Sequence, residues 1–176
     1  FESNTAPTPH CIISNGVGKS FYPKCIDKPD AYRDRFVILY TGRYSREKSH
    51  KVLIDGVNRS QHRDQIQLIF AGSGPMEKRL RKYAKKRLPI QPVFRFFSRD
   101  EMTQLVNYAD LYVHPARYEA EGIACLEAMA CGKVILSSDS PKSATRFFVL
   151  SPDNLFRTND ANDLAYRIDY WLEHPA

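Results

Sequence analysis

Short apolar runs alternate with segments of helical periodicity along most of this 176-residue chain. Phe36 to Thr41 and Ile66 to Ala71 are rich in bulky and β-branched residues, which is typical of strands buried on both faces. Apolar residues such as Val52, Leu53 and Val57 then recur at helical spacing. This alternation predicts an α/β fold, a Rossmann-like parallel sheet sandwiched by helices, with ligands at the carboxyl ends of the strands.

The boundaries of these elements follow from the same patterns. Ser98 and Glu101 have the spacing of a capping box, which places a helix start between the third and fourth strands. We expect strands at 36–41, 66–71, 93–97, 111–114 and 133–138, and helices at 48–59, 76–88, 98–108, 123–131 and 160–173.

Polar and glycine-containing loops follow each predicted strand. Because parallel strands end at one edge of their sheet, these loops are expected to meet on a single rim. This convergence weighs against a purely structural role for each loop taken alone. The loops are Gly42-Arg43, Gly72 to Gly74, Phe97-Ser98, Arg117 to Gly122 and Ser137 to Ser140.

Glu119 and Glu127 are two carboxylates placed eight positions apart around a predicted helix start. Free backbone N–H groups of Gly122, Ile123 and Ala124 would point out of that helix and could bind an anion or a hydroxyl-rich ligand. Glu127 lies one turn into the helix on the side of Ile123 and Ala124, and Glu119 lies in the loop before it. A helix salt bridge or a capped helix start would explain the same spacing.

Arg43 and Lys48 follow the first predicted strand and supply the cations that a diphosphate needs. Arginine makes forked contacts with phosphate oxygens, and lysine acts as a point charge. A solvated basic loop is the alternative, because Arg46 and Lys51 lie close by in the sequence.

Gly72 and Gly74 have the spacing of the first two glycines of a dinucleotide fingerprint, but Glu77 stands where the third glycine would be. A nicotinamide or flavin site is therefore not expected. A tight turn, or a close approach of the backbone to a ligand, fits this segment better.

Several motifs, in the same order, resemble those of the retaining family 4 glycosyltransferases, which have the GT-B fold. Glu119 and Glu127 match the two-glutamate signature of that family. Tyr40 to Lys48 resembles its phosphate-contacting Gly-Arg segment, Phe70 to Leu80 its Gly-x-Gly-Pro turn, and Cys11 to Pro23 the Asn-Gly-Val segment that opens its C-terminal half. The resemblance implies the C-terminal, donor-binding half of such an enzyme.

The resemblance also implies roles for individual residues. Glu119 would bond the 3-hydroxyl of the transferred sugar, Glu127 the ribose hydroxyls, and Arg43 and Lys48 the donor diphosphate. With these cations present, neither a metal nor another cofactor is required. Further contacts with the nucleotide-sugar are expected at Gly42, Gly72, Gly74, Phe97, Ser98, Gly122, Ile123 and Ala124.

Three positions depart from the usual family pattern. Ser49 stands where a glycine is common, and Glu121 where an apolar residue is common. The loop from Ser137 to Phe147 lacks the usual Gly-Gly turn and resembles that of the cholesterol α-glucosyltransferases and related glycolipid synthases. This implies a hexosyltransferase that passes glucose from UDP-glucose to a lipid or glycan hydroxyl. Two nearby acids also permit a glycoside hydrolase, which would not need Arg43 and Lys48.

The resemblance divides the chain into two parts. Residues 1–15 are expected to be a crossover segment from an N-terminal domain that carries the acceptor site. Residues 16–176 would be the nucleotide-sugar-binding domain, truncated before a C-terminal return helix. We therefore expect these residues alone to bind nucleotide without turnover. A non-catalytic nucleotide-sugar-binding module is the alternative.

The net charge and the cysteine spacing limit the possible partners and the cellular location of this protein. The net charge of +6 and the basic run Lys78 to Arg87 suit a solvated helix face, an anionic membrane surface or nucleic acid. Nucleic acid is not expected, because the aromatic residues fall in strands and not in an RNA-binding pattern. No apolar run could span a membrane, and four cysteines without zinc spacing suit a cytoplasmic protein, with peripheral contact at the inner membrane face as an open alternative.

Overall fold

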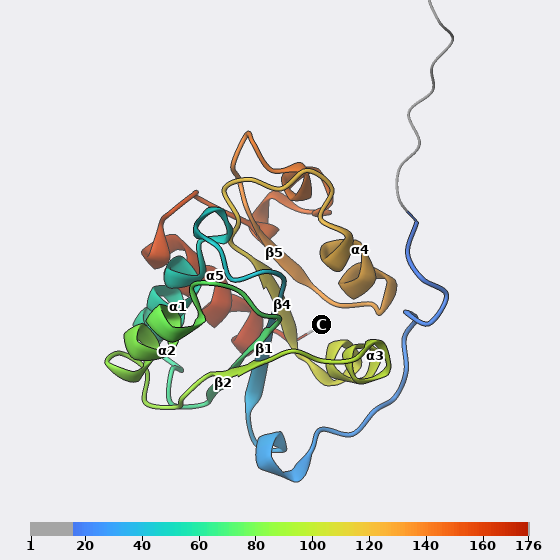
Figure 1. Cartoon of the computed structure of the whole chain (residues 1–176), viewed down its shortest axis with the longest axis horizontal. Coiled ribbons are helices and arrows are strands. Elements are labelled where there is room, and N and C mark those ends of the chain that lie inside the picture. Colours follow the sequence, from blue (N-terminus) through green and yellow to red (C-terminus); the bar gives the residue numbers. More distant parts are fainter. Residues whose placement is uncertain (1–15, 176) are drawn as a thin grey trace, which may run out of the picture.

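A parallel β-sheet runs through the computed structural model, which describes residues 16–175 (Figure 1). The strand order is β3-β2-β1-β4-β5-β6, and every neighbouring pair is parallel. The expected fold class is therefore confirmed. The strands are β1 (Phe36–Thr41), β2 (Ile66–Ala71), β3 (Val93–Arg95), β4 (Leu111–His114), β5 (Ile135–Ser138) and β6 (Leu155–Phe156).

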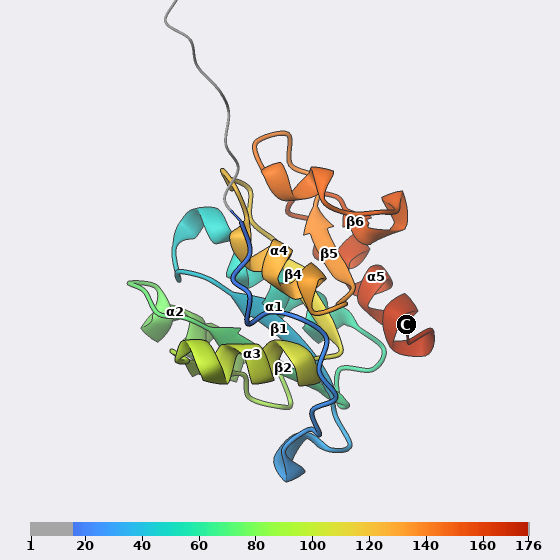
Figure 2. The same cartoon turned by 90° about the vertical axis from the view of Figure 1, so that its right-hand side faces the viewer.

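Helices cover both faces of the sheet, so the strands are apolar on both sides (Figure 2). Successive β1 side chains point to opposite faces: Ile38 and Tyr40 pack in the cluster with α1, α2 and α5, and Val37 and Leu39 in the cluster with α3 and α4. The helices are α1 (His50–Arg59), α2 (Glu77–Lys85), α3 (Arg99–Tyr108), α4 (Ile123–Ala130) and α5 (Ala161–Glu173).

The order of the strands reverses between β1 and β4. From β1 the chain proceeds outward to β2 and β3, and then crosses back to β4 on the other side of β1. Helices on opposite faces diverge at such a point, and the carboxyl ends of the two strands open into a crevice where α/β proteins bind ligands. The loops after β1 and β4, which carry Lys48 and Glu119, meet there.

Element boundaries differ from the expected ones where the backbone turns. The helix expected from residue 48 begins at His50, because Ser49 has a left-handed conformation (φ 53°) after a short 3-10 turn, Arg46–Lys48. The strand expected to reach residue 97 ends at Arg95, whose carbonyl accepts the N–H of Gly72, just past the end of β2. β6 has two residues, too few for a periodic pattern. The expected crossover segment, 1–15, lies outside the described residues.

Candidate functional site

At the rim beside the β1–β4 crevice, Lys48 meets two side chains from a distant part of the chain, His114 and Glu119. Lys48 Nζ lies 2.6 Å from Glu119 Oε2, and His114 Nε2 lies 3.1 Å from the same oxygen. The Lys48 and Glu119 side chains are each 17% exposed and that of His114 is 2% exposed, so the carboxylate is largely shielded from solvent. Two residues that the sequence assigned to donor binding thus contact each other.

Backbone hydrogen bonds hold the loop that carries Glu119. The N–H of Glu119 donates to the carbonyl of Lys142, and its carbonyl accepts the N–H of Ala144 at 2.9 Å. The N–H of Arg117 donates to the carbonyl of Glu47, which joins this loop to the one that carries Lys48. The position of the carboxylate is therefore set by the fold around it.

The partners of Glu119 keep its carboxyl group ionised. The hydrogen bond from His114, followed by that from Lys48, lowers the pKa of Glu119 to about 2, although partial burial opposes the shift. Because an ionised carboxylate accepts hydrogen bonds, His114 Nε2 carries the proton between them. Glu119 is thus a fixed hydrogen-bond acceptor and cannot act as a general acid near neutral pH.

His114 was not singled out from the sequence as a site residue. It is the last residue of β4, where its ring packs against Tyr40 and Tyr112. Its Nδ1 has no hydrogen-bond partner among the described residues. A polar residue that ends an otherwise apolar strand at the ligand-binding rim was the available signal.

Replacing Glu119 with glutamine is expected to lower the free energy of unfolding at neutral pH by roughly 1–3 kcal/mol, because the carboxyl is only partly buried. A lowered native pKa gives stability that is present above the unfolded value of 4.5 and is lost as pH falls towards 2. The difference between parent and variant should therefore shrink over that range. Urea denaturation at several pH values measures it, and a pH-independent difference would contradict the assignment.

A hollow of about 570 Å³ opens beside this cluster, at the ends of β1 and β2. The Arg43 guanidinium is exposed there and makes no ion pair within residues 16–175. A Cβ at Gly72 (φ 156°) would lie 2.1 Å from the Gly42 carbonyl oxygen, so the two turns can pack together only if Gly72 lacks a side chain. The hollow is lined by Thr41, Gly42, Arg43, Ala71, Gly72, Ser73, Gly74 and Phe96.

The N-terminus of α4 presents free donors on the same rim. Gly122 caps the helix in the left-handed region (φ 67°), and a Cβ there would lie 2.3 Å from Thr145 Cγ2. No side chain caps the helix, and in the described part of the chain the N–H groups of Ile123 and Ala124 donate to no other group. These donors and the helix dipole favour an anion at this position.

Glu127 lies one turn into α4 and has no ion pair within the described region, which rules out the helix salt bridge considered from the sequence. Its side chain is half-buried, and burial raises the pKa of Glu127, whereas the nearby Arg99 lowers it. A half-buried carboxylate without a partner is unfavourable in the free protein and is available to accept hydrogen bonds from a ligand.

The loop after β3 is arranged differently from the expected one. Ser98 forms the expected capping box with Glu101, so its side chain is already bonded within α3. Phe97 is partly buried, with the Arg95 guanidinium 4.7 Å from its ring centre. Phe96, which is 73% exposed, lines the hollow at Gly42 and Gly72 instead.

Solved structures share this architecture. The catalytic domain of cholesterol-alpha-glucosyltransferase from Helicobacter pylori is 43% identical, with a TM-score of 0.75 over 78% of this chain and 86% of that one. Anabaena Alr3699/HepE, solved in complex with UDP and glucose, is 23% identical, with a TM-score of 0.72 over 82% of this chain and 40% of that one. The fold is the C-terminal half of a GT-B glycosyltransferase.

The family follows from sequence comparison. A profile described as "Glycosyl transferases group 1" matches residues 23–176, and the chain belongs to this family. The putative glycosyltransferase EpsF of Bacillus subtilis is 27% identical over 137 residues, which cover 73% of this chain and 36% of EpsF. The chain thus spans about a third of the length of the curated relatives it matches. The inference from the motifs that the chain is a C-terminal GT-B glycosyltransferase domain is confirmed.

Within residues 16–175, no group of three or more His, Cys, Asp or Glu side chains could hold a metal ion. No helix in that part of the chain is both long and apolar enough to cross a membrane.

Proposed function

We propose that this chain is the donor-binding part of a retaining hexosyltransferase that passes glucose from UDP-glucose to a hydroxyl of a lipid or glycan. The observation that carries the proposal is the contact of Lys48 and His114 with the ionised Glu119 beside the free N–H groups of α4. The 43% identity to the cholesterol-alpha-glucosyltransferase domain supports the choice of glucose and of a lipid-type acceptor. The relatives' greater length supports an acceptor site outside this chain.

Different residues of the rim would contact the diphosphate, the sugar and the ribose of the donor. Arg43, Lys48 and the N-terminus of α4 would stabilise the negative charge that develops on the leaving diphosphate. Glu119 would accept a hydrogen bond from a sugar hydroxyl while Lys48 lies between this carboxylate and the phosphates. Glu127 would accept from the ribose hydroxyls. Because Arg43 and Lys48 are already cationic before the donor binds, no metal ion is needed to stabilise the negative charge on the diphosphate.

Calorimetric titration of the 176-residue chain with UDP, UDP-glucose and GDP-mannose tests the donor assignment. We expect UDP and UDP-glucose to bind at least about tenfold more tightly than GDP-mannose, a difference that corresponds to one specific base contact. A preference for GDP-mannose, or no binding by the folded chain, would contradict it.

The same protein should bind UDP-glucose without transferring glucose, because the acceptor site is expected in another domain. Incubation with labelled UDP-glucose and candidate lipid acceptors measures this. Glucosylated product formed by these 176 residues would show that the chain is a complete enzyme. For an enzyme that includes the acceptor site, NMR of the product should show the anomeric configuration of the donor.

A further inference from the structure

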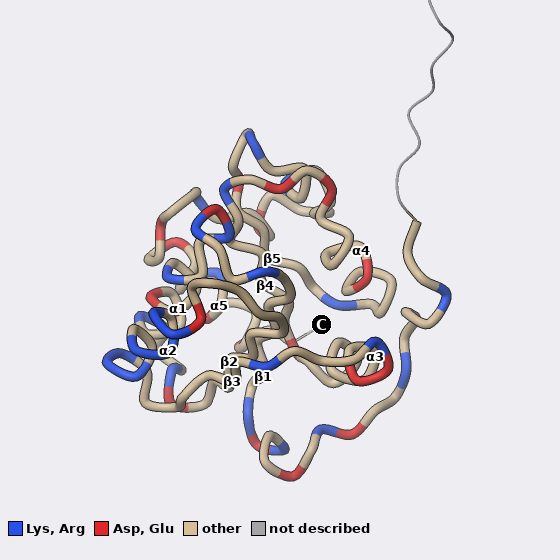
Figure 3. The backbone as a smooth tube through the Cα atoms, viewed as in Figure 1, with Lys and Arg blue, Asp and Glu red and all other residues tan. Residues whose placement is uncertain are grey.

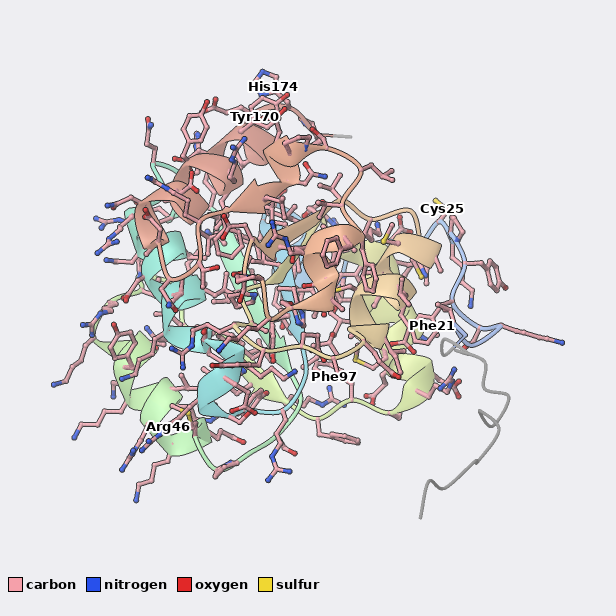
Figure 4. All side chains as sticks on the ribbon, turned by 90° about the horizontal axis from the view of Figure 1, so that it is seen from above. Phe21, Cys25, Arg46, Phe97, Tyr170 and His174 are labelled. Atoms are coloured by element: carbon pink, nitrogen blue, oxygen red, sulfur yellow. The ribbon has the colours of Figure 1, made fainter. Side chains whose placement is uncertain are left out.

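A second hollow, of about 380 Å³, lies between the first turns of α1 and α2 and shares no lining residue with the hollow at Gly42 and Gly72. Figure 4 shows Arg46, which lines it, beside α2 and well away from Phe97. Its lining residues are Ser45, Arg46, Ser49, His50, Lys51, Val52, Met76, Arg79, Leu80, Arg117 and Asn159.

Four cations from four segments surround this hollow. Arg46 precedes α1, Lys51 lies in its first turn, Arg79 lies in α2, and Arg117 follows β4. No carboxylate lines the hollow, and none of the four cations has an ion pair within the described residues. Lys and Arg gather in this part of the molecule, along α2 and the loop before α1 (Figure 3).

The carboxylates nearest in sequence are already engaged elsewhere. Glu47 accepts from the Ser45 hydroxyl, and Glu77 pairs with Arg81. Asp55 accepts from the Tyr83 hydroxyl and pairs with Arg87. The lining of the hollow therefore carries four cations and no carboxylate, and Glu47 is the acid whose charge acts on the lining residue His50. A concave site lined by one sign of charge concentrates the field and attracts a counter-ion.

Backbone donors at the start of α1 lie beside the same hollow. The His50 ring is not one of these donors, because it is 2% exposed and packs edge-on against Tyr40 and Tyr44. Burial lowers the pKa of His50 to about 4, so the ring is neutral near pH 7 and adds no charge to the hollow. Ser49 starts α1 without a side-chain cap, and the first backbone N–H groups of that helix, His50 and Lys51, donate to no group in the described region.

We propose that this hollow is a second anion site, which binds the phosphate group of a ligand other than the sugar donor. Arginine forks and free helix N–H groups are the donors that suit phosphate oxygens. The phosphate could come from a free phosphorylated metabolite or from the headgroup of an anionic lipid, and both present the same chemistry to Arg46, Arg79 and Arg117.

Inorganic phosphate is the probe for the first test, in proteins that all carry Arg43→Met and Lys48→Met to remove the cations of the candidate donor site. Adding the test pair, Arg46→Gln and Arg79→Gln, should weaken phosphate binding at least about tenfold. The control pair, Lys78→Gln and Lys82→Gln, removes two exposed charges from α2, the helix of Arg79, and should change phosphate binding less than about twofold. Calorimetry measures both. No binding by the common parent, or equal losses in the two pairs, would overturn the proposal.

Vesicles distinguish the two sources of phosphate. The same proteins are sedimented with vesicles of phosphatidylcholine containing phosphatidic acid, and with phosphatidylcholine alone. If the site binds a lipid headgroup, replacing Arg46 and Arg79 should reduce sedimentation with the phosphatidic acid vesicles more than replacing Lys78 and Lys82 does. If the site binds a free metabolite, the two pairs of substitutions should reduce sedimentation equally, and only the Arg46 and Arg79 substitutions should weaken the binding of inorganic phosphate. Either result supports a phosphate site.

Discussion

Replacing Arg43 and Lys48 together with methionine is expected to weaken UDP binding by about a thousandfold, while uridine binding stays the same within about twofold. A hydrogen bond to a charged group contributes roughly 1.5–3 kcal/mol, so each replacement alone should cost about tenfold to a hundredfold. The Arg43 guanidinium is exposed in the rim hollow, and Lys48 reaches the same rim through its contact with Glu119. Calorimetric titration with UDP and uridine measures the difference.

Two controls separate phosphate contacts from general charge effects. Lys78→Met with Lys82→Met removes the same charge from α2, at exposed positions that do not line the rim hollow, and should leave UDP affinity nearly unchanged. Thermal unfolding of each variant shows that the fold is intact. Equal weakening of UDP and uridine, or an equal effect of the control pair, would mean that Arg43 and Lys48 do not contact the diphosphate.

Glu127→Ala is expected to weaken the binding of both UDP and uridine by about tenfold to a hundredfold, because the ribose is common to the two ligands. The variant should also unfold at the same temperature as the parent or a higher one. The Glu127 carboxylate is half-buried without an ion pair in the described part of the chain, so its removal relieves a desolvation cost. Loss of ligand binding without loss of stability is typical of a residue retained for function.

A ligand lacking one ribose hydroxyl provides the matched control for Glu127. The parent should bind 2′-deoxy-UDP more weakly than UDP, and the Glu127→Ala variant should bind the two ligands equally. This non-additivity is expected when a side chain and a hydroxyl contact each other. Additive losses would place Glu127 away from the ribose.

The fold could be predicted from the sequence wherever a strand is buried on both faces. Phe36–Thr41, Ile66–Ala71 and Leu111–His114 have the bounds expected from their apolar composition. The errors occur where hydrogen-bond geometry, and not composition, ends an element. Ser49 adopts a left-handed conformation that no pattern of apolar residues predicts. β6 forms because Leu155 and Phe156 align with β5, a long-range pairing without a local signal.

The sequence allowed us to predict which residues form the site better than which of them contact each other. The motifs gave Glu119 and Lys48 separate roles, but 71 positions separate them, and only the folded chain shows that they pair. His114 was missed because its role depends on a carboxylate that the next loop brings to it. Phe96 and Phe97 are chemically equivalent in the sequence, and the turn after β3 decides which of them lines the hollow.

The measurement that tests the central claim most directly is mapping of backbone amide chemical-shift changes as UDP is added to the 176-residue chain. The largest changes are expected at Gly42 and Gly72 and at the start of α4, from Gly122 to Ala124, because these N–H groups lie on the rim assigned to the nucleotide-sugar. Changes confined to the basic helix α2, or none at saturating UDP, would contradict a donor site at the carboxyl ends of the strands.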